Sequence, residues 1–224
     1  MTTSYVSRGG LKLRHALDTF HIDPTNLVCA DLGCSTGGFT DCLLQSGAAK
    51  VYDVDTAYGQ LAWKLRKDPR VVVMERQNAL HATPPEPVDL VVADLGWTPQ
   101  RLLIPVALKW LKPAASSPQH LDTSTPWHPP LLITLIKPHY ELKATGKELP
   151  RGGVLDEADA RSTTDAVVAS LPALGVHVLA ITKSPITGGA TEGKRSKGTG
   201  NTEWLALVAP AGSKELPAGA SGRF

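Results

Sequence analysis

The sequence predicts an α/β fold built on a mostly parallel, seven-stranded sheet that ends in an antiparallel C-terminal hairpin. Strand-like segments rich in valine, leucine and isoleucine recur along the chain, and helix-like stretches separate most of them. This alternation is typical of a parallel sheet that helices cover on both faces. The last connection, residues 183–201, is rich in glycine, serine, threonine and lysine and has no helical period. Because a parallel neighbour needs a crossover, the final two strands are predicted to pair antiparallel.

Helices are predicted where apolar residues repeat at helical spacing. The first begins in "SRGGLKLRHAL", and its apolar face is formed by Leu13, Ala16, Leu17 and Phe20. The second follows a glycine-rich turn, and its apolar face, formed by Phe39, Cys42 and Leu43, ends before Gly47 as the C-cap. A later helix covers residues 156–174, because Asp156 is a suitable N-cap and Gly175 is a suitable stop.

The strands are predicted in the apolar segments between these stretches. They are "NLVCADL" (26–32), "AKVYDVD" (49–55), "RVVVME" (70–75), "VDLVVAD" (88–94), "LLITLIK" (131–137), "VHVLAIT" (176–182) and "TEWLALV" (202–208). With 224 residues, 42% of them hydrophobic, the chain suits a single domain, which we place at residues 1–209. Residues 113–130 and 188–201 are expected to be surface loops, and residues 210–224 a disordered tail.

The composition argues against several classes of protein. No apolar run approaches the roughly 20 residues that cross a membrane, and "MTTSYVSRGG" at the N-terminus has no apolar signal core. We therefore expect a soluble cytoplasmic protein with no membrane partner. The three cysteines, Cys29, Cys34 and Cys42, form neither a CxxC pair nor a metal-ligand spacing. They are expected to be reduced structural thiols, and no metal site is predicted.

Positive charge is clustered although the formal net charge is only +2 and the pI is near 8.4. The clusters are Arg8 with Lys12 and Arg14, residues 64–70, and Lys194 with Arg195 and Lys197. Such clusters suit a polyanionic partner and are equally compatible with ordinary solvated faces.

A glycine-rich turn follows the first predicted strand, in "DLGCSTGGFT" from Asp31 to Thr40. Gly33, Ser35 and Gly38 have the spacing of G-x-G-x-x-G with serine at the middle position, and Asp55 ends the second strand. Glycines in a strand-to-helix turn let a ligand approach the backbone and the helix N-terminus, while the later acid can bind ribose hydroxyls. The turn therefore predicts a nucleotide-type cofactor.

NAD and S-adenosylmethionine both fit that description. A pyrophosphate prefers glycine amides without a nearby acid, whereas the methionine end of S-adenosylmethionine carries an ammonium and a sulfonium that an aspartate attracts. Asp31 at the turn and the predicted terminal hairpin therefore favour S-adenosylmethionine.

Four charged residues stand on separate predicted elements: Lys12, Asp94, Lys137 and Glu203. Asp94 and Lys137 end the fourth and fifth strands, so both are expected to open on the cofactor crevice. Lys12 lies at the edge of the apolar face of the first helix, and Glu203 lies in the last strand beside Trp204. Singly, each has an ordinary explanation as a solvated stem, a turn acceptor or an edge charge. Together, in this order, they indicate a reaction site.

Long segments of the chain match a known pattern. They are "YVSRGGLKL", "DLGCSTGGFTDCLLQSGA", "VYDVDTAYGQLAWKLRKDPRVVVMERQN", "DLVVAD", "IKPHYE", "SPITG" and "GNTEWL". From about Tyr5 to Val208 the chain resembles the FtsJ-like ribose 2′-O-methyltransferases of the TlyA (hemolysin A) type, which methylate rRNA. The resemblance implies a Rossmann-like methyltransferase fold, S-adenosyl-L-methionine as cofactor, and RNA, in particular rRNA or a ribosomal subunit, as partner.

The resemblance also implies roles for individual residues. The family's catalytic tetrad falls on Lys12, Asp94, Lys137 and Glu203, and Lys137 is expected nearest the 2′-hydroxyl, as a base or as a fixed charge that stabilises the alkoxide. The expected cofactor-binding residues are Asp31, Gly33, Ser35, Gly37, Gly38, Phe39, Asp55 and Asn78. The expected RNA-binding residues are Arg8, Arg14, Trp97, Lys194, Arg195 and Lys197. Trp97 could equally be a buried packing residue.

The chain departs from the family's pattern at three places. Family members commonly carry a small N-terminal RNA-binding domain, whereas this chain starts almost directly at "YVSRGGLKL". It has Gly96 and Trp97 in place of serine and phenylalanine, and His139 and Tyr140 in place of glutamine and phenylalanine. These changes flank the expected active site. A non-catalytic RNA-binding or ribosome-assembly role, and a methyltransferase acting on another substrate such as a small molecule, therefore remain alternatives.

Overall fold

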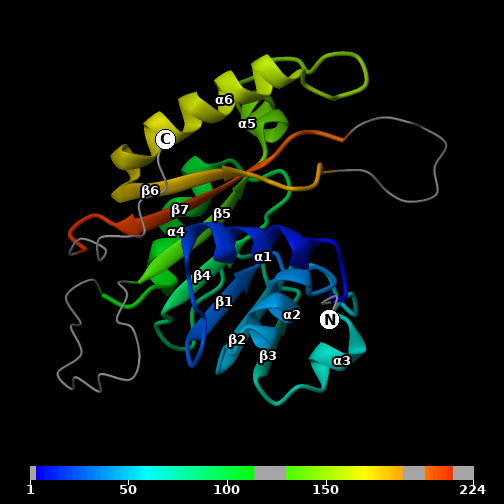
Figure 1. Cartoon of the computed structure of the whole chain (residues 1–224), viewed down its shortest axis with the longest axis vertical. Coiled ribbons are helices and arrows are strands. Elements are labelled where there is room, and N and C mark those ends of the chain that lie inside the picture. Colours follow the sequence, from blue (N-terminus) through cyan, green and yellow to red (C-terminus); the bar gives the residue numbers. More distant parts are fainter. Residues whose placement is uncertain (1–3, 114–129, 189–199, 214–224) are drawn as a thin grey trace.

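The computed structural model describes residues 4–113, 130–188 and 200–213. A sheet of seven strands in the order β3-β2-β1-β4-β5-β7-β6 runs through them (Figure 1). The strands are β1 (Val28–Leu32), β2 (Lys50–Asp55), β3 (Val71–Glu75), β4 (Leu90–Ala93), β5 (Leu131–Ile136), β6 (Val176–Lys183) and β7 (Trp204–Pro210). The first five pair in parallel, and β7 pairs antiparallel with both β5 and β6. The predicted fold class and the terminal hairpin are confirmed.

Helices occupy most connections between the strands. They are α1 (Gly9–Phe20), α2 (Gly38–Gln45), α3 (Trp63–Arg66), α4 (Gln100–Trp110), α5 (Pro138–Ala144), α6 (Glu157–Ser170) and the 3₁₀ helix η1 (Leu171–Leu174). Asp156 caps α6 as predicted, because its side chain accepts the backbone N–H of Asp159. The predicted helix 156–174 is thus two elements, an α-helix that tightens into a 3₁₀ turn.

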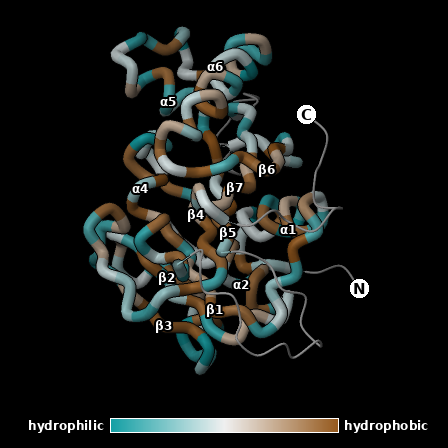
Figure 2. The backbone as a smooth tube through the Cα atoms, turned by 90° about the vertical axis from the view of Figure 1, so that its left-hand side faces the viewer, coloured by the Kyte–Doolittle hydropathy of each residue, from teal (hydrophilic) through white to brown (hydrophobic). Residues whose placement is uncertain are grey.

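The sheet has a hydrophobic core on each face. Alternate residues of β4 show this division, since Leu90 and Val92 join the core on the α1 and α2 side, whereas Val91 and Ala93 join the core on the α4 side. Figure 2 shows the hydrophobic stretches of the strands in the middle of the molecule. Burial on both faces explains why the strands are almost continuously apolar.

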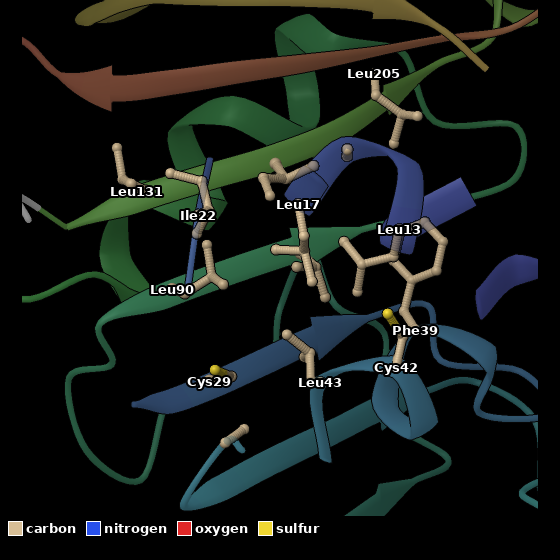
Figure 3. Close-up of a cluster of buried hydrophobic side chains, with 14 of the residues drawn as sticks. Leu13, Leu17, Ile22, Cys29, Phe39, Cys42, Leu43, Leu90, Leu131 and Leu205 are labelled. Carbon is tan, nitrogen blue, oxygen red and sulfur yellow. The ribbon is translucent and has the colours of Figure 1, made fainter. Parts of the chain in front are cut away.

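The first helix is held by apolar contacts with α2 and the sheet. Leu13 and Leu17 of α1 lie in one cluster with Phe39, Cys42 and Leu43 of α2, above residues of β1, β4 and β5 (Figure 3). Cys29, Cys34 and Cys42 are buried free thiols, in agreement with their predicted structural role. Burial is also the main reason why the pKa of Cys42 is raised to about 11.

Two predicted boundaries need correction. β7 continues to Pro210, and the N–H of Ala211 donates to the carbonyl of Gly175, so the tail predicted from residue 210 begins inside an ordered strand. Most of the predicted loops, residues 113–130 and 188–201, lies outside the described residues. The ends of the second loop form a β-bridge in which the N–H of Gly188 donates to the carbonyl of Asn201 over 2.9 Å.

None of the described helices has the length and apolar character needed to span a membrane.

Leu17→Ala is predicted to lower the free energy of unfolding by about 2–5 kcal/mol, because Leu17 is 1% exposed and its truncation leaves a cavity under α1. Leu11→Ala is the matched control in the same helix, since Leu11 is 46% exposed. Urea denaturation of both variants checks the prediction. Equal losses for the two positions would contradict the placement of α1.

Candidate active site

A cavity of about 1120 Å³ opens at the carboxyl ends of β1, β2, β4 and β5. Its wall combines the glycine turn after β1, the end of β2, the segments after β4 and β5, and the start of α1. This is the position at which open parallel sheets bind ligands, because the connections on the two sides of β1 leave in opposite directions.

The glycine turn is shaped by close contacts with its neighbours. Gly33 has a φ of +89°, and a Cβ there would lie 3.0 Å from the carbonyl oxygen of Asp94. Asp55 accepts the N–H of Ser35 through Oδ2 and the N–H of Ala57 through Oδ1, each over 2.8 Å. Asp55 therefore braces the turn as well as lining the cavity.

The N-termini of α1 and α2 touch because glycines occupy the contact. A Cβ on Gly38 would lie 2.2 Å from the hydroxyl of Ser7 and 2.9 Å from the backbone nitrogen of Gly10. No other residue type fits at Gly38 without moving α1. This contact holds the first turn of α1, and with it Lys12, at the cavity.

The four charged residues form two ion pairs. Lys137 Nζ lies 2.5 Å from Asp94 Oδ1, and Lys12 Nζ lies 2.6 Å from Glu203 Oε2. Lys12 and Glu203 are buried, whereas the side chains of Lys137 and Asp94 stay 15% and 22% exposed and line the cavity. The more accessible of the two ion pairs is therefore Lys137 with Asp94.

The two ion pairs are electrostatically coupled. Burial raises the pKa of Glu203, the charges of Lys12 and Lys137 act to lower it, and Asp94 raises it further. Gly188 makes room for this carboxylate, since a Cβ on Gly188 would lie 2.0 Å from Glu203 Oε1. The tetrad is thus one cluster with two positive and two negative side chains.

Asp31 presents a buried carboxylate with one oxygen left over. Its Oδ2 accepts the N–H and the hydroxyl of Thr40 over 3.0 and 2.8 Å, and its Oδ1 has no partner among the described residues. Asp31 is fully buried and lines the cavity. An unpaired buried carboxylate oxygen costs free energy unless a donor reaches it, so the site suits a ligand with a cationic group.

Trp97 lies at the cavity mouth and is 70% exposed, so the alternative of a buried packing residue is wrong. Its ring centroid is 4.5 Å from that of Tyr140, and Lys143 Nζ lies 5.0 Å from the Trp97 ring. Its φ of +61° is a left-handed backbone conformation that turns the chain after Asp94. The indole face is open to solvent beside the reachable ion pair.

Most of the predicted site residues meet at this cavity. Those that line it are Arg8, Lys12, Asp31, Gly33, Ser35, Gly38, Phe39, Asp55, Asn78, Asp94, Trp97 and Lys137. Gly37 is not in the wall, and Arg14 bonds to Ser46 and pairs with Asp18 instead. Lys194, Arg195 and Lys197 lie outside the described residues.

Glu203 lies one residue before β7 and not in the last strand as predicted, since pairing with β5 and β6 begins at Trp204. Its carbonyl accepts the N–H of Ser184, which holds the carboxylate behind Lys12.

Sequence reasoning missed several wall residues. They include Ser7, Thr36, Gln60, Ile186, Thr187 and Gly188. The segment "SPITG" contains Ile186 to Gly188, but its composition alone does not distinguish it from any other turn. Within residues 4–113, 130–188 and 200–213, no three histidine, cysteine or carboxylate side chains are grouped to hold a metal ion.

Known proteins share this sequence and fold. The family model described as FtsJ-like methyltransferase matches residues 5–194. The chain is 40% identical over 190 residues to the 16S/23S rRNA (cytidine-2′-O)-methyltransferase TlyA of Mycobacterium tuberculosis, covering 83% of this chain and 64% of that protein. It is 34% identical over 207 residues to hemolysin A of Brachyspira hyodysenteriae, covering 90% of this chain and 75% of that protein.

Solved structures agree. The structure of a "putative hemolysin" from Lactococcus lactis superimposes with a TM-score of 0.74 at 34% identity, covering 91% of this chain and 88% of that one. The chain spans less than two thirds of the length of the mycobacterial relative.

Lys12→Met is predicted to lower the free energy of unfolding by about 3–5 kcal/mol, because it leaves Glu203 buried without its counter-ion. Replacing both residues, as Lys12→Met with Glu203→Leu, should cost less than Lys12→Met alone. Urea denaturation measures the three proteins. Lys50→Met, which removes one partner of a half-exposed ion pair with Glu86, is the control and should change stability little. A double variant that loses as much stability as Lys12→Met alone, or more, would contradict the coupling.

Proposed function

The chain belongs to the FtsJ-like methyltransferase family, and from that membership we propose that it transfers a methyl group from S-adenosylmethionine to a ribose 2′-hydroxyl of rRNA. The observation that carries the proposal is the partly exposed Lys137–Asp94 ion pair in the same cavity as the glycine turn and Asp31. The turn can hold the cofactor, and the ion pair can act on a hydroxyl placed beside it. The mycobacterial relative is named as an rRNA methyltransferase, which supports rRNA as the substrate.

S-adenosylmethionine, when bound, supplies a methyl group that its sulfonium has already activated. The ammonium of its methionine part would meet the unpartnered Oδ1 of Asp31, next to the N-terminus of α2. Asp55 would accept the ribose hydroxyls, because each of its oxygens has a second lone pair besides the one that binds the turn. Asn78 lines the same wall and would face the adenine.

Lys137 would act on the attacking hydroxyl. Because Lys137 Nζ lies 2.5 Å from Asp94 Oδ1, we assign Lys137 the role of a fixed positive charge that stabilises the developing alkoxide. Asp94 holds the ammonium in place, and the buried pair of Lys12 and Glu203 fixes the elements around it. The hydroxyl proton leaves to solvent at the open mouth. A base role would require Lys137 to lose its proton before the substrate binds.

Trp97 would stack on the target base or its neighbour. Trp97 packs on Tyr140. In the sequence, Trp97 follows Asp94 by three residues and Tyr140 follows Lys137 by three residues. A base held on this aromatic pair would bring its ribose toward Lys137. Arg8 and Lys143 add positive charge at the mouth for the RNA backbone.

Transfer of labelled methyl from S-adenosylmethionine to total rRNA, followed by nuclease mapping, tests the proposed function. Label on the ribose of one defined nucleotide is the expected result. Cofactor binding without an RNA product would favour the non-catalytic RNA-binding alternative, and labelled small molecules without labelled RNA would favour a different substrate.

Lys137→Ala is predicted to lower the rate of methyl transfer by about 10²–10⁴-fold while cofactor affinity persists, because the charge beside the hydroxyl is lost. Lys137→Arg should keep at least a tenth of the activity if the charge is what matters, since arginine stays protonated. Single-turnover methylation measures both rates. Lys109→Ala, an exposed lysine of α4, is the control. Equal loss in the alanine and arginine variants would assign Lys137 the role of a base.

Trp97→Ala is predicted to raise the KM for RNA about tenfold or more, because base stacking on an aromatic ring contributes roughly 1–3 kcal/mol. Trp97→Phe should restore most of the affinity. Steady-state methylation measures KM, and calorimetry checks that cofactor binding is unchanged. Trp63→Ala is the matched control, since Trp63 is 66% exposed and lies outside the cavity wall. An unchanged KM in Trp97→Ala would remove Trp97 from the RNA site.

A further inference from the structure

The hydroxyl of Thr40 lies between two fully buried carboxyl groups. Asp31 of β1 and Asp53 of β2 are direct neighbours in the sheet register, and neither has any exposed surface. Thr40 Oγ1 lies 2.8 Å from Asp31 Oδ2 and 2.6 Å from Asp53 Oδ1. Asp53 is not in the wall of the cavity, so no role follows for it from ligand contact.

A count of protons shows what these two contacts require. A threonine hydroxyl carries one hydrogen, so it can donate to only one of the two carboxylates. The other contact is a hydrogen bond only if that carboxyl carries a proton and donates it to Thr40 Oγ1. The three side chains therefore share two hydrogens, and the aspartate pair holds one proton between its two carboxyl groups.

We propose that Asp53 is a positioning residue that stores this proton, so that Thr40 donates to Asp31 and Asp31 keeps its negative charge for the ammonium group of the cofactor. The inference rests on the proposed function, because it assigns Asp31 to cofactor binding. It goes beyond that function by giving a task to a buried carboxyl group that touches no ligand.

The hydrogen bonds favour Asp53 as the protonated partner. Asp31 Oδ2 accepts the backbone N–H of Thr40 whichever way the Thr40 hydroxyl points, and it stands at the first turn of α2, where the helix dipole favours negative charge. Asp53 has only the Thr40 hydroxyl, and its Oδ2 has no partner among the described residues. If the proton is on Asp53, the negative charge stays on Asp31, which has more hydrogen-bond donors.

The surroundings of the pair also favour one retained proton. Burial raises the pKa of both carboxyl groups, that of Asp53 to about 7, and repulsion within the pair makes the second ionisation harder than the first. Further negative charge near Asp31 comes from Asp94, which directly follows β4. No ion pair among the described residues includes Asp31 or Asp53.

The other titratable neighbours do not supply a counter-charge. Cys29 and Cys34 stay neutral, because burial raises the pKa of both thiols. On α2, Asp41 is neutralised by its ion pair with Lys64. A cationic group on a bound ligand would therefore supply a counter-charge that these neighbours do not.

The direction of the pH effect follows from the raised pKa of Asp53. Its ordinary value is 3.8, so between about pH 4 and pH 7 the folded protein holds a proton that the unfolded chain has lost. Stability is therefore lost as the pH rises through this range. Asp53→Asn removes this loss, because asparagine donates an N–H to Thr40 at every pH.

Thermal unfolding of the full chain and of Asp53→Asn, from pH 5 to pH 8, tests the shared proton without any ligand. The melting temperature of Asp53→Asn should rise relative to that of the original chain across this range. Asp41→Asn is the control, because Asp41 is a buried aspartate of α2 outside the cavity wall. The difference in melting temperature between Asp41→Asn and the original chain should not increase with pH. A constant difference for Asp53→Asn would overturn the proposal.

Calorimetric titration with S-adenosylmethionine tests the positioning role. At pH 6, Asp53→Asn should bind within about threefold of the original chain, because both present a donor to Thr40. Between pH 6 and pH 8 the affinity of the original chain should increase by at least about threefold relative to that of Asp53→Asn. The reason is that a bound cation favours ionisation of Asp53, which the asparagine cannot undergo. Both proteins bind the same cofactor, so the titration of its own amine cancels in the ratio of the two affinities.

The outcomes separate this inference from the proposed function. A tenfold weaker Asp53→Asn at pH 6, or a constant ratio, overturns the positioning role while leaving cofactor binding intact. Asp31→Asn should bind the cofactor at least tenfold more weakly. If Asp31→Asn binds normally, or the original chain does not bind at all, the cofactor assignment fails, and with it the positioning role. The thermal unfolding result still decides whether the proton is shared.

Discussion

The buried ion pair between Lys12 and Glu203 joins the first helix to the residue before the last strand, across 191 positions of sequence. Removing two charges from water is costly, so this contact exists only where both side chains are held against each other. α1 must therefore stand over the sheet at a fixed angle, and β7 must begin at a fixed register beside β5. The partly exposed pair of Lys137 and Asp94 depends on the same alignment, because the two residues directly follow neighbouring strands at that edge.

Close backbone contacts support this electrostatic arrangement. Gly38 lets α1 touch α2, Gly33 lets the turn pass the carbonyl of Asp94, and Gly188 leaves space for the Glu203 carboxylate. Each contact lies at the cavity wall or directly behind it. The chain thus uses small residues where charged groups from distant segments must meet, and large apolar residues on the two faces of the sheet.

Much of the fold and part of the site could be predicted because they depend on local patterns. Continuous apolar runs identify buried parallel strands, and a lysine or an aspartate directly after such a run must stand at the edge of the sheet, as Lys137 and Asp94 do. The role of Asp53 could not be predicted, since within "VYDVD" it looks like the polar residue of an alternating strand. Only the register with Asp31 and the position of Thr40 show that it is buried in a shared hydrogen bond. The exposure of Trp97 depends on a left-handed turn that its sequence does not favour.

The antiparallel direction of β7 has a consequence for how the site is assembled during folding. At this edge of the sheet the parallel strands end, whereas the antiparallel β7 begins there. Glu203, just before β7, is therefore synthesised late in the chain and pairs with Lys12, which is synthesised early. Until β7 inserts between β5 and β6, Lys12 has no counter-ion and α1 cannot bury it at low cost. The candidate site therefore has its four charged residues together only when the last strand of the sheet is in place.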